Sequence, residues 1–483
     1  MKNTLQNLIG TSELAGVGAC KLNLQSSTLH LQPSTRASKC LAILLAGAAL
    51  GSNSAWAQLD YATPYTFITT AGTFGESGAQ DGTNGAAQFG FPAAVALDSN
   101  DDQYVVDNYY YTVRKVTPVG TNWVVTTIAG TADVTGSLDG TNQTIEFNEP
   151  TSIARDLAGN LYVTDAGNNT VRKLTPQGTN WVSSTIAGTA NYSGGSANGT
   201  NGAAQFYYPS GIAVDAAGNL YVADTYNDTI RRVAHVGANW VVTTIAGTVG
   251  SGLSTDGTNQ AAQFYQPAGI AVDQSSNIFV ADTGNYTIRK ITPVGTNWVT
   301  TTIAGTSGIY GAADGTNGAA EFLSPFYDGP MGLAVDAGDD VYVADSGNGL
   351  IRKVSPVGTN WVTTTLAGNI NLNTGADGTG TNAVFGAPWG IAVDAAGLLF
   401  VADAGGNDMR EGSIAGVPNL TISQSAGNVI TVSWPAGGFI LQTNAVLGTA
   451  NWGPYGGAVN TTNGTSNVTV SPAQGNLFFR LTN

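Results

Sequence analysis

Gly211-Ile212-Ala213-Val214-Asp215, followed after a short turn by Leu220-Tyr221-Val222-Ala223-Asp224, is the stretch that decides the fold. The first phrase recurs in recognisable form six times along the chain, ending at Asp98, Asp156, Asp215, Asp273, Asp336 and Asp394. Self-similarity at a nearly constant interval indicates a repeat architecture, in which each copy is one unit of several strands or helices.

Fixed intervals follow each copy of the phrase. A second Asp comes nine residues later and an Arg seven residues after that: Asp107 with Arg114, Asp165 with Arg172, Asp224 with Arg231, Asp282 with Arg289, Asp345 with Arg352, and Asp403 with Arg410. The length varies only between a later Gly, such as Gly247, and the next copy of the phrase. Constant spacing indicates strands joined by tight hairpins, and the variable segment indicates one adaptable loop per repeat.

Each repeat has the pattern of four strands, which we name a to d. In the third repeat we expect them at Gly211–Asp215, Leu220–Asp224, Thr229–Val233 and Trp240–Ala246, since these runs are rich in β-branched and aromatic residues. A hairpin over residues 235–239 would join strands c and d. Four-stranded units repeated around an axis predict an all-β fold, a six-bladed β-propeller.

The two ends of the repeat region indicate how the ring closes. The sixth repeat leaves its pattern at Ser413–Gly416 without a d strand, whereas Phe67–Gly72 is a d strand with no a, b or c strand before it. We therefore expect Phe67–Gly72 to pair with strand c of the last blade near Met409–Ser413. That pairing would leave no open sheet edge.

The repeats resemble the NHL-repeat β-propeller family, most closely where Val280-Ala281 precedes Asp282-Thr283-Gly284-Asn285-Tyr286-Thr287-Ile288-Arg289-Lys290. The resemblance covers roughly Pro64 to Gly416 and implies a six-bladed ring. The family's namesake His is absent, and its position holds Tyr111, Asn169, Asp228, Tyr286, Gly349 and Asn407. Tyr110 also stands where the family usually has Asn.

The first 57 residues have the pattern of a long secretory leader. Arg36 and Lys39 precede the apolar run 40–50, and Ala55-Trp56-Ala57 is a small-x-small cleavage signal, so we expect the mature chain to begin near Gln58. This predicts a secreted bacterial protein, periplasmic or extracellular. Both cysteines, Cys20 and Cys40, precede the cut, and the mature chain would have no disulfide.

The predicted domains are the leader over 1–57, the propeller over 58–416 and a small β-sandwich-like module over 417–483. The module contains strand-like runs such as residues 429–434 and 477–481. The mature chain is predicted to be a monomer and to have no transmembrane segment.

Charge and histidine content exclude several functions. The formal net charge of −15 becomes about −18 once the leader, with four basic residues and one acid, is removed. Such a surface repels nucleic acid phosphates. Only His235 remains in the mature chain, so a multi-His metal site or a His-based triad is excluded, and we expect no cofactor and no bound metal. Asp81 and its counterparts give one acid per Gly-rich loop, too few for calcium.

The repeated Asp and Arg residues are predicted to be structural, with each Arg bonding carbonyls or Asp between blades, because a ligand at one axis does not need the same charge in every blade. A ligand should instead contact residues that differ between blades. Those on the face with the d–a and b–c loops are Tyr109, Tyr111, Glu149, Tyr208, Tyr226, Asp228, Gln266, Phe326, Tyr327, Asp328, Trp389 and Asp408.

Aromatic side chains with scattered carboxylates suit the faces of sugars or peptide segments. One interpretation is therefore a secreted, non-catalytic scaffold that binds a glycan, peptide or protein. The alternative is a propeller hydrolase or lyase that uses carboxylates alone. The lack of His and Cys in the mature chain favours the scaffold.

Overall fold

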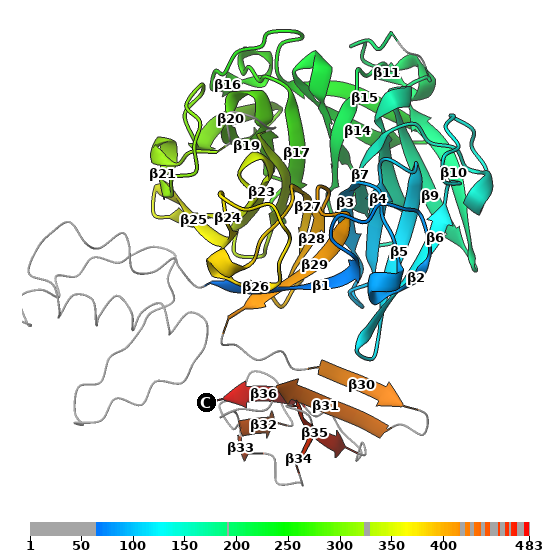
Figure 1. Cartoon of the computed structure of the whole chain (residues 1–483). Helices are drawn as coiled ribbons and strands as arrows, with labels where there is room; N and C mark the ends of the chain where they lie inside the picture. The colour runs from blue at the N-terminus through cyan, green and yellow to red at the C-terminus, as the bar shows by residue number, and fades with distance from the viewer. Residues whose placement is uncertain are drawn as a thin grey trace, which may run out of the picture. The chain divides into compact units, whose positions relative to one another are not determined.

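The computed structural model describes residues 64–190, 193–322 and 329–415, together with strand segments between residues 421 and 482. Six antiparallel sheets, the blades, stand around a common axis in a β-propeller (Figure 1). The predicted leader and its cleavage site lie outside the described residues. Among the residues described, no helix is both long and apolar enough to cross a membrane.

The inner strands of each blade are strands a and b. Strand a begins with Pro in every blade and is β3 (Pro92–Leu97), β7 (Pro150–Arg155), β12 (Pro209–Val214), β17 (Pro267–Val272), β22 (Pro330–Val335) and β27 (Pro388–Val393). Strand b ends with the repeated Asp and is β4 (Gln103–Asp107), β8 (Leu161–Asp165), β13 (Leu220–Asp224), β18 (Ile278–Asp282), β23 (Val341–Asp345) and β28 (Leu399–Asp403). All of strand b is buried in each blade, which accounts for its short, nearly continuous apolar run.

The outer strands of each blade are strands c and d. Strand c is β5 (Thr112–Val119), β9 (Thr170–Gln177), β14 (Thr229–Val236), β19 (Thr287–Val294), β24 (Leu350–Val357) and β29 (Asp408–Ile414). Strand d is β6 (Asn122–Ala129), β10 (Asn180–Ala187), β15 (Asn239–Ala246), β20 (Asn297–Ala304), β25 (Asn360–Gly368) and, in the sixth blade, β1 (Tyr65–Gly72).

The c–d hairpin is tighter than the sequence pattern predicts. In the third blade His235 pairs with Trp240 and Val236 with Asn239, so only Gly237 and Ala238 form the turn. Gly237 has a φ of 63°, a conformation that glycine adopts at little cost and that a two-residue hairpin requires. Strands c and d are therefore longer than expected.

The closing pairing is confirmed. β1 pairs antiparallel with β29 from Tyr65 opposite Ile414 to Gly72 opposite Asp408, with one irregularity between Thr69 and Ala71. Phe67 is fully buried and meets the ring of Phe385 edge-on at 5.0 Å. The first described strand thus completes the last blade and removes its open edge.

Five blades carry a short fifth strand that the sequence pattern did not predict. These outer strands pair with strand d and are β2 (Gly82–Thr83), β11 (Gly199–Thr200), β16 (Gly257–Thr258), β21 (Gly315–Thr316) and β26 (Gly378–Thr379). A 3₁₀ turn follows each, and one also occurs in the second blade: η1 (Asn84–Ala86), η2 (Asn142–Thr144), η4 (Asn201–Ala203), η6 (Asn259–Ala261), η8 (Asn317–Ala319) and η10 (Gly380–Asn382). Each d–a connection therefore covers the outer edge of the blade that it enters.

Further 3₁₀ turns form the b–c loops of the second to fifth blades: η3 (Ala166–Asn168), η5 (Thr225–Asn227), η7 (Thr283–Asn285) and η9 (Ser346–Asn348). The b–c and d–a loops emerge on one face, here called the loop face. The a–b turns and c–d hairpins emerge on the other, here called the hairpin face.

The hydrophobic core is divided among the six seams between neighbouring blades. One cluster joins Tyr162 and Val171 of the second blade to Phe206, Ile212 and further residues of the third. Phe206 and its counterparts Phe89, Phe147, Phe264, Phe322 and Phe385 come from the d–a connections and are almost fully buried. Each Phe therefore wedges between two blades.

The C-terminal strands form two sheets, described here by themselves. One has the order β30 (Thr421–Ser425), β31 (Val429–Pro435), β35 (Thr465–Val470) and β34 (Asn460–Thr462). The other has the order β33 (Gly453–Pro454), β32 (Ile440–Asn444) and β36 (Phe478–Thr482).

Candidate ligand-binding site

The loop face is shaped by the residue that precedes the first Pro of strand a. This residue has a left-handed backbone in four blades, with φ of 69° at Phe91, 48° at Glu149, 53° at Tyr208 and 48° at Gln266. Such a conformation costs a non-glycine residue about 1–3 kcal/mol and persists only where its surroundings hold it.

The b–c loop of the preceding blade stabilises this conformation. Asn169 Oδ1 accepts the backbone N–H of Tyr208 at 2.7 Å, and Asp228 Oδ1 accepts that of Gln266 at 2.8 Å. Asn407 Oδ1 accepts the N–H of Phe91 at 2.9 Å in the same way. In these three blades, the residue at the position of the family's namesake His therefore fixes the loop that follows it around the axis.

A pocket of about 220 Å³ lies on the axis and is lined by the first residues of the inner strands. All six blades contribute, with Ala94, Ser152, Gly211, Gly269, Gly332 and Gly390 at equivalent positions. Four predicted site residues, Tyr208, Tyr226, Gln266 and Trp389, are among those that line it.

Where glycine occupies this position, the a strands pack so closely that a side chain would not fit. A Cβ at Gly211 would collide with the carbonyl oxygen of Ala268, and one at Gly269 with that of Met331. These glycines let neighbouring a strands approach each other.

Two aromatic clusters flank the pocket. Tyr208 stacks on Tyr226 with ring centroids 4.9 Å apart and an interplanar angle of 19°. Trp389 meets Phe91 in a T-shaped contact at 4.6 Å. Tyr226 remains 46% exposed and Trp389 is partly exposed, so both rings can still contact a ligand.

Glu149 is held beside the pocket by one of these rings. The Tyr208 hydroxyl donates to Glu149 Oε2 at 3.0 Å. Burial and the neighbouring carboxylate raise the pKa of the Tyr208 hydroxyl, so it stays protonated and keeps donating. Glu149 is exposed and is not among the residues that line the pocket.

The other predicted site residues lie elsewhere. Tyr109 is 61% exposed in its b–c loop, and Tyr111 packs into the seam between the first two blades; neither lines the pocket. Asp228 is buried and bonded to backbone N–H groups of Gln266 and Gly252. Phe326, Tyr327 and Asp328 fall outside the described residues.

Asp408 was expected in a loop, and the structure places it elsewhere. It is the first residue of β29, pairs with Asp403 across the sheet and is 1% exposed. The equivalent residue is Thr in four of the blades, so the repeat pattern already places this position at the start of strand c.

Several pocket residues are not among those predicted from the sequence. Ser152, Ser210, Thr225 and Met331 line the pocket from strand a or the b–c turn. Ser210 and Met331 directly follow the Pro of strand a, as Trp389 does. That shared position is the signal that could have identified them.

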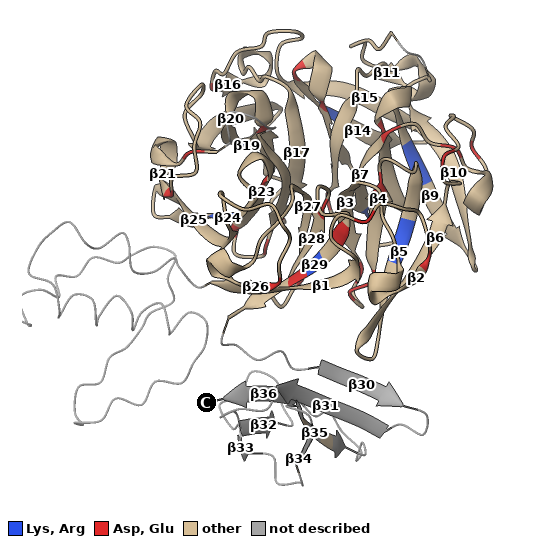
Figure 2. Cartoon of the chain, viewed as in Figure 1, with Lys and Arg blue, Asp and Glu red and all other residues tan. Residues whose placement is uncertain are grey.

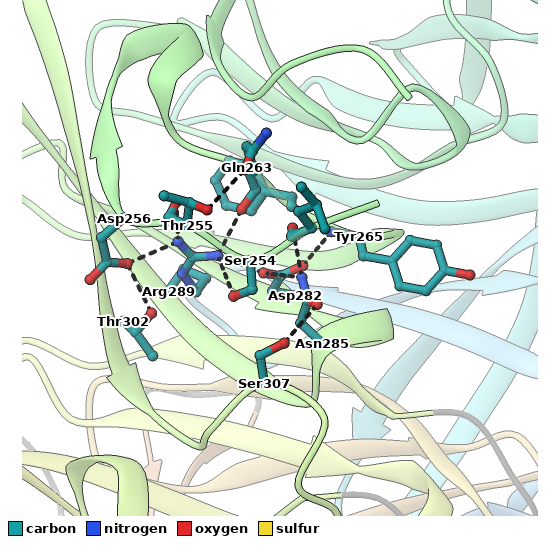
Figure 3. Close-up of polar contacts among 12 residues, drawn as sticks. Ser254, Thr255, Asp256, Gln263, Tyr265, Asp282, Asn285, Arg289, Thr302 and Ser307 are labelled. Atoms are coloured by element: carbon teal, nitrogen blue, oxygen red, sulfur yellow. Dashed lines mark hydrogen bonds and ion pairs between the residues drawn. The ribbon is translucent and has the colours of Figure 1, made fainter. Parts of the chain in front are cut away.

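The repeated Arg and Asp form a buried network, shown for the fourth blade in Figure 3. Arg289 donates to Asp282 Oδ2 at 2.6 Å, to Asp256 Oδ1 at 2.9 Å and to the carbonyl of Gln263 at 3.0 Å. The Arg289 side chain is fully buried and its guanidinium lies 5.0 Å from the ring centre of Phe264. The Arg thus ties the incoming d–a connection to its own blade, whereas we had expected bonds between blades.

The repeated Asp residues also have their hydrogen-bonding capacity used within the blade. Asp282 also accepts the backbone N–H of Tyr265 at 2.8 Å and the amide of Asn285 at 2.9 Å. Burial raises the pKa of Asp282 to about 6, against the opposing effect of Arg289. A carboxylate enclosed in this way cannot reach a ligand.

The described residues contain no group of three or more His, Cys, Asp or Glu side chains that could hold a metal. Figure 2 shows that basic residues are few on the ring and lie on strands such as β5 and β9. Pocket-lining residues within the described ranges include no Asp, Glu, Lys, Arg or His.

Comparison with protein families identifies the repeats. The family model for the NHL repeat matches residues 206–232, 264–291 and 327–354, which fall in the third, fourth and fifth blades. The chain belongs to the NHL-repeat β-propellers.

Two curated relatives match more than half of this chain. The chain is 28% identical over 305 residues to the chloroplastic protein SUPPRESSOR OF QUENCHING 1 of Arabidopsis thaliana, covering 59% of this chain and 27% of that protein. It is 28% identical over 306 residues to NHL repeat-containing protein 2 of Bos taurus, covering 57% of this chain and 40% of that protein. The chain therefore spans well under half the length of these relatives.

Solved structures share the propeller fold. An auxiliary nutrient binding protein of Bacteroides thetaiotaomicron superposes with a TM-score of 0.53 at 17% identity, covering 72% of this chain and 76% of that one. An auxiliary nutrient binding protein of Bacteroides ovatus superposes with a TM-score of 0.52 at 17% identity, covering 74% of this chain and 78% of that one. A Bacteroides thetaiotaomicron protein of unknown function superposes with a TM-score of 0.55 at 21% identity, covering 72% of this chain and 76% of that one.

Proposed function

We propose that this NHL-repeat propeller is an exported, non-catalytic binding protein that holds its ligand in the axial pocket of the loop face. The observation that carries the proposal is the pocket lining, in which aromatic rings, hydroxyl groups and an amide occur without an ionisable acid or base other than tyrosine within the described ranges. Pockets of this kind, apolar with a few convergent polar groups, are typical of ligand binding. The fold shared with nutrient binding proteins supports the proposal.

The alternative, a hydrolase or lyase that relies on carboxylates, has less support. Glycoside hydrolysis, for example, uses two carboxyl groups that flank the scissile bond. Among the described residues Glu149 is an exposed acid that contacts a pocket residue, whereas Asp228, which accepts the backbone N–H of Gln266, is buried, and the repeated Asp residues are buried in their networks. One exposed carboxylate is too few for this chemistry.

Binding arrays of glycans and peptides would test the proposal. We expect a ligand whose retention depends on Trp389: Trp389→Ala should weaken binding at least several-fold, because an aromatic contact contributes about 0.5–1.5 kcal/mol beyond buried area. Tyr109→Ala, a change on the same face but outside the pocket, is the matched control. Equal retention by wild type and Trp389→Ala would refute the site.

Export forms part of the proposal and rests on the leader pattern of residues 36–57. Mass spectrometry of the protein from the periplasm or medium should find an N-terminus at or near Gln58. A cytoplasmic product that retains Cys20 and Cys40 would contradict it.

A further inference from the structure

We infer that the axial pocket takes one uncharged sugar ring and discriminates against sugars that carry a carboxylate. This inference rests on the proposed binding function and specifies its ligand. It draws on the positions of the aromatic clusters, the hydrogen-bonding groups between them and the charges around the rim.

The two aromatic clusters lie on opposite sides of the axis. Trp389 belongs to β27, which packs against β22 and β3, whereas Tyr208 directly precedes β12, which packs against β7 and β17. The sixth and third blades therefore share no neighbour and face each other across the pocket. A flat ring that enters along the axis can contact Trp389 on one side and the Tyr208–Tyr226 pair on the other.

These aromatic faces suit a ring edged with C–H groups. The face of an aromatic ring is electron-rich, and the C–H groups of a sugar ring are weakly positive. Phe91 packs edge-on against Trp389, and Tyr226 stacks on Tyr208, so the rings are held in place before a ligand arrives. Preorganised rings lose little side-chain entropy on binding.

Polar groups between the walls match sugar hydroxyls. Ser152 Oγ accepts the N–H of Ile212 at 3.3 Å, so its hydroxyl can donate into the pocket. The Thr225 hydroxyl lies 2.7 Å from Ser210 Oγ and 2.8 Å from the carbonyl oxygen of Pro267, so the protons of Thr225 and Ser210 serve these two bonds and Ser210 offers the pocket an acceptor. The exposed Gln266 amide can donate and accept. A sugar hydroxyl does both as well, whereas a quaternary ammonium group would use the aromatic walls and leave these groups unpaired.

The charge distribution disfavours an anionic ligand. No Lys or Arg lines the pocket within the described ranges, and Glu149 stands at its rim, fixed by Tyr208. Burying a ligand carboxylate without a cation is costly, and a second carboxylate nearby adds repulsion.

The size of the pocket limits what enters. Its volume of about 220 Å³ lies below the ~300–1,000 Å³ typical of sites for drug-sized ligands. The neighbouring a strands approach each other closely at Gly211 and Gly269, where they line the pocket. One ring at the end of a glycan therefore fits better than an internal segment of a folded peptide.

Isothermal titration of the purified protein with maltose, cellobiose, digalacturonate, choline and dialanine tests the inference. We expect at least one neutral disaccharide to bind, and digalacturonate and choline to bind at least ten-fold more weakly. Trp389→Ala should lower the affinity for the neutral sugar at least several-fold, Trp389→Phe should restore part of it, and Tyr109→Ala should not change it. Glu149→Gln should narrow the gap between neutral sugar and digalacturonate. Thermal melting of each variant separates loss of binding from loss of fold.

The outcomes distinguish the two proposals. If digalacturonate binds as tightly as the neutral disaccharides, or if none of the neutral disaccharides binds, the sugar inference is overturned. If choline or dialanine then binds and Trp389→Ala abolishes that binding, the axial pocket remains the binding site. If Trp389→Ala alters the binding of no probe, the proposed function fails together with the inference.

Discussion

Arg289 shows how one residue can have a structural role in each blade and none at the ligand site. Its guanidinium joins Asp282 of its own sheet to Asp256 of the connection that enters the blade. Both side chains of the Arg289–Asp282 pair are fully buried, so that bond is shielded from solvent, whereas the Asp256 side chain is about half exposed. The same geometry recurs at Arg172 and Arg352.

Replacing Arg289 by Ala should reduce the free energy of unfolding by about 3–5 kcal/mol, because Asp282 would remain buried without its partner. Urea denaturation of the variant measures this change. The control is Lys290→Ala, at the next position on β19. We expect it to reduce the free energy of unfolding by less than about 1 kcal/mol. A loss for Arg289→Ala no larger than that of the control would contradict the structural role.

Asp408 introduces a destabilising charge into the closing blade. Burial, together with the nearby carboxylate of Asp403, raises the pKa of Asp408 to about 8. The unfolded chain releases this proton near pH 4, so raising the pH from about 4 to about 8 favours unfolding. Asp408 Oδ1 also has no hydrogen-bond partner within the described structure.

Asp408→Thr, which restores the residue found in four other blades, should therefore stabilise the protein. We expect Tm to rise by several degrees at pH 8 and by less at pH 5, since the unfavourable deprotonation grows with pH across this window. Calorimetry at both pH values checks the result. A gain that is the same at both pH values would show that the carboxylate is not the cause.

At the scale of elements, β1 carries the closure of the ring. It covers the edge of β29 along its length, and Phe67 fills the seam beside Phe385. Removing residues 65–72 should expose that edge and this apolar surface, and so cause aggregation. Size-exclusion chromatography would detect it.

The control for this deletion removes residues 58–64 and leaves β1 intact. That variant should remain monodisperse. If the chain without residues 65–72 also eluted as a monodisperse species with an unchanged Tm, the closure by β1 would not be needed.

Strands a to d could be predicted because their residue pattern is local in the sequence. Strands a to d recur with constant spacing, and the unmatched strand at each end predicted the β1–β29 pairing. The outer strands such as β2 were missed because two residues, Gly82 and Thr83, show no alternation of apolar and polar side chains. Their pairing with β6 depends on the path of the whole connection.

The pocket was only partly predictable for a related reason. Trp389 and Tyr208 stand out because they differ between blades, but the sequence cannot show which loop residues reach the axis. Ring closure decides this, and it places Ser152 and Met331 in the lining while Tyr109 stays outside. In the sequence, a residue such as Ser152 within an inner strand resembles an ordinary core residue. Only the assembly of the six strands around the axis shows that it lines the pocket.

At the scale of the whole molecule, the ring is complete within residues 65–414. All six blades have their four long strands there, and the seam between the fifth and sixth blades is filled by ring residues such as Tyr65 and Leu399. A chain that ends at residue 416 should therefore keep the Tm of the full-length ring, since each domain with its own core can fold independently. Calorimetry of the two chains makes the comparison.

A chain that ends at residue 410 provides the contrasting case. It loses Glu411 to Ile414, which pair with Ile68 to Tyr65, and should expose half of the edge of β1 and unfold at a lower temperature. Limited proteolysis of the full chain should cut near Ala415–Asn419 and leave a stable ring. If the ring truncated at 416 unfolded as readily as the ring truncated at 410, the C-terminal strands would be part of the propeller's stability and the boundary at 416 would be wrong.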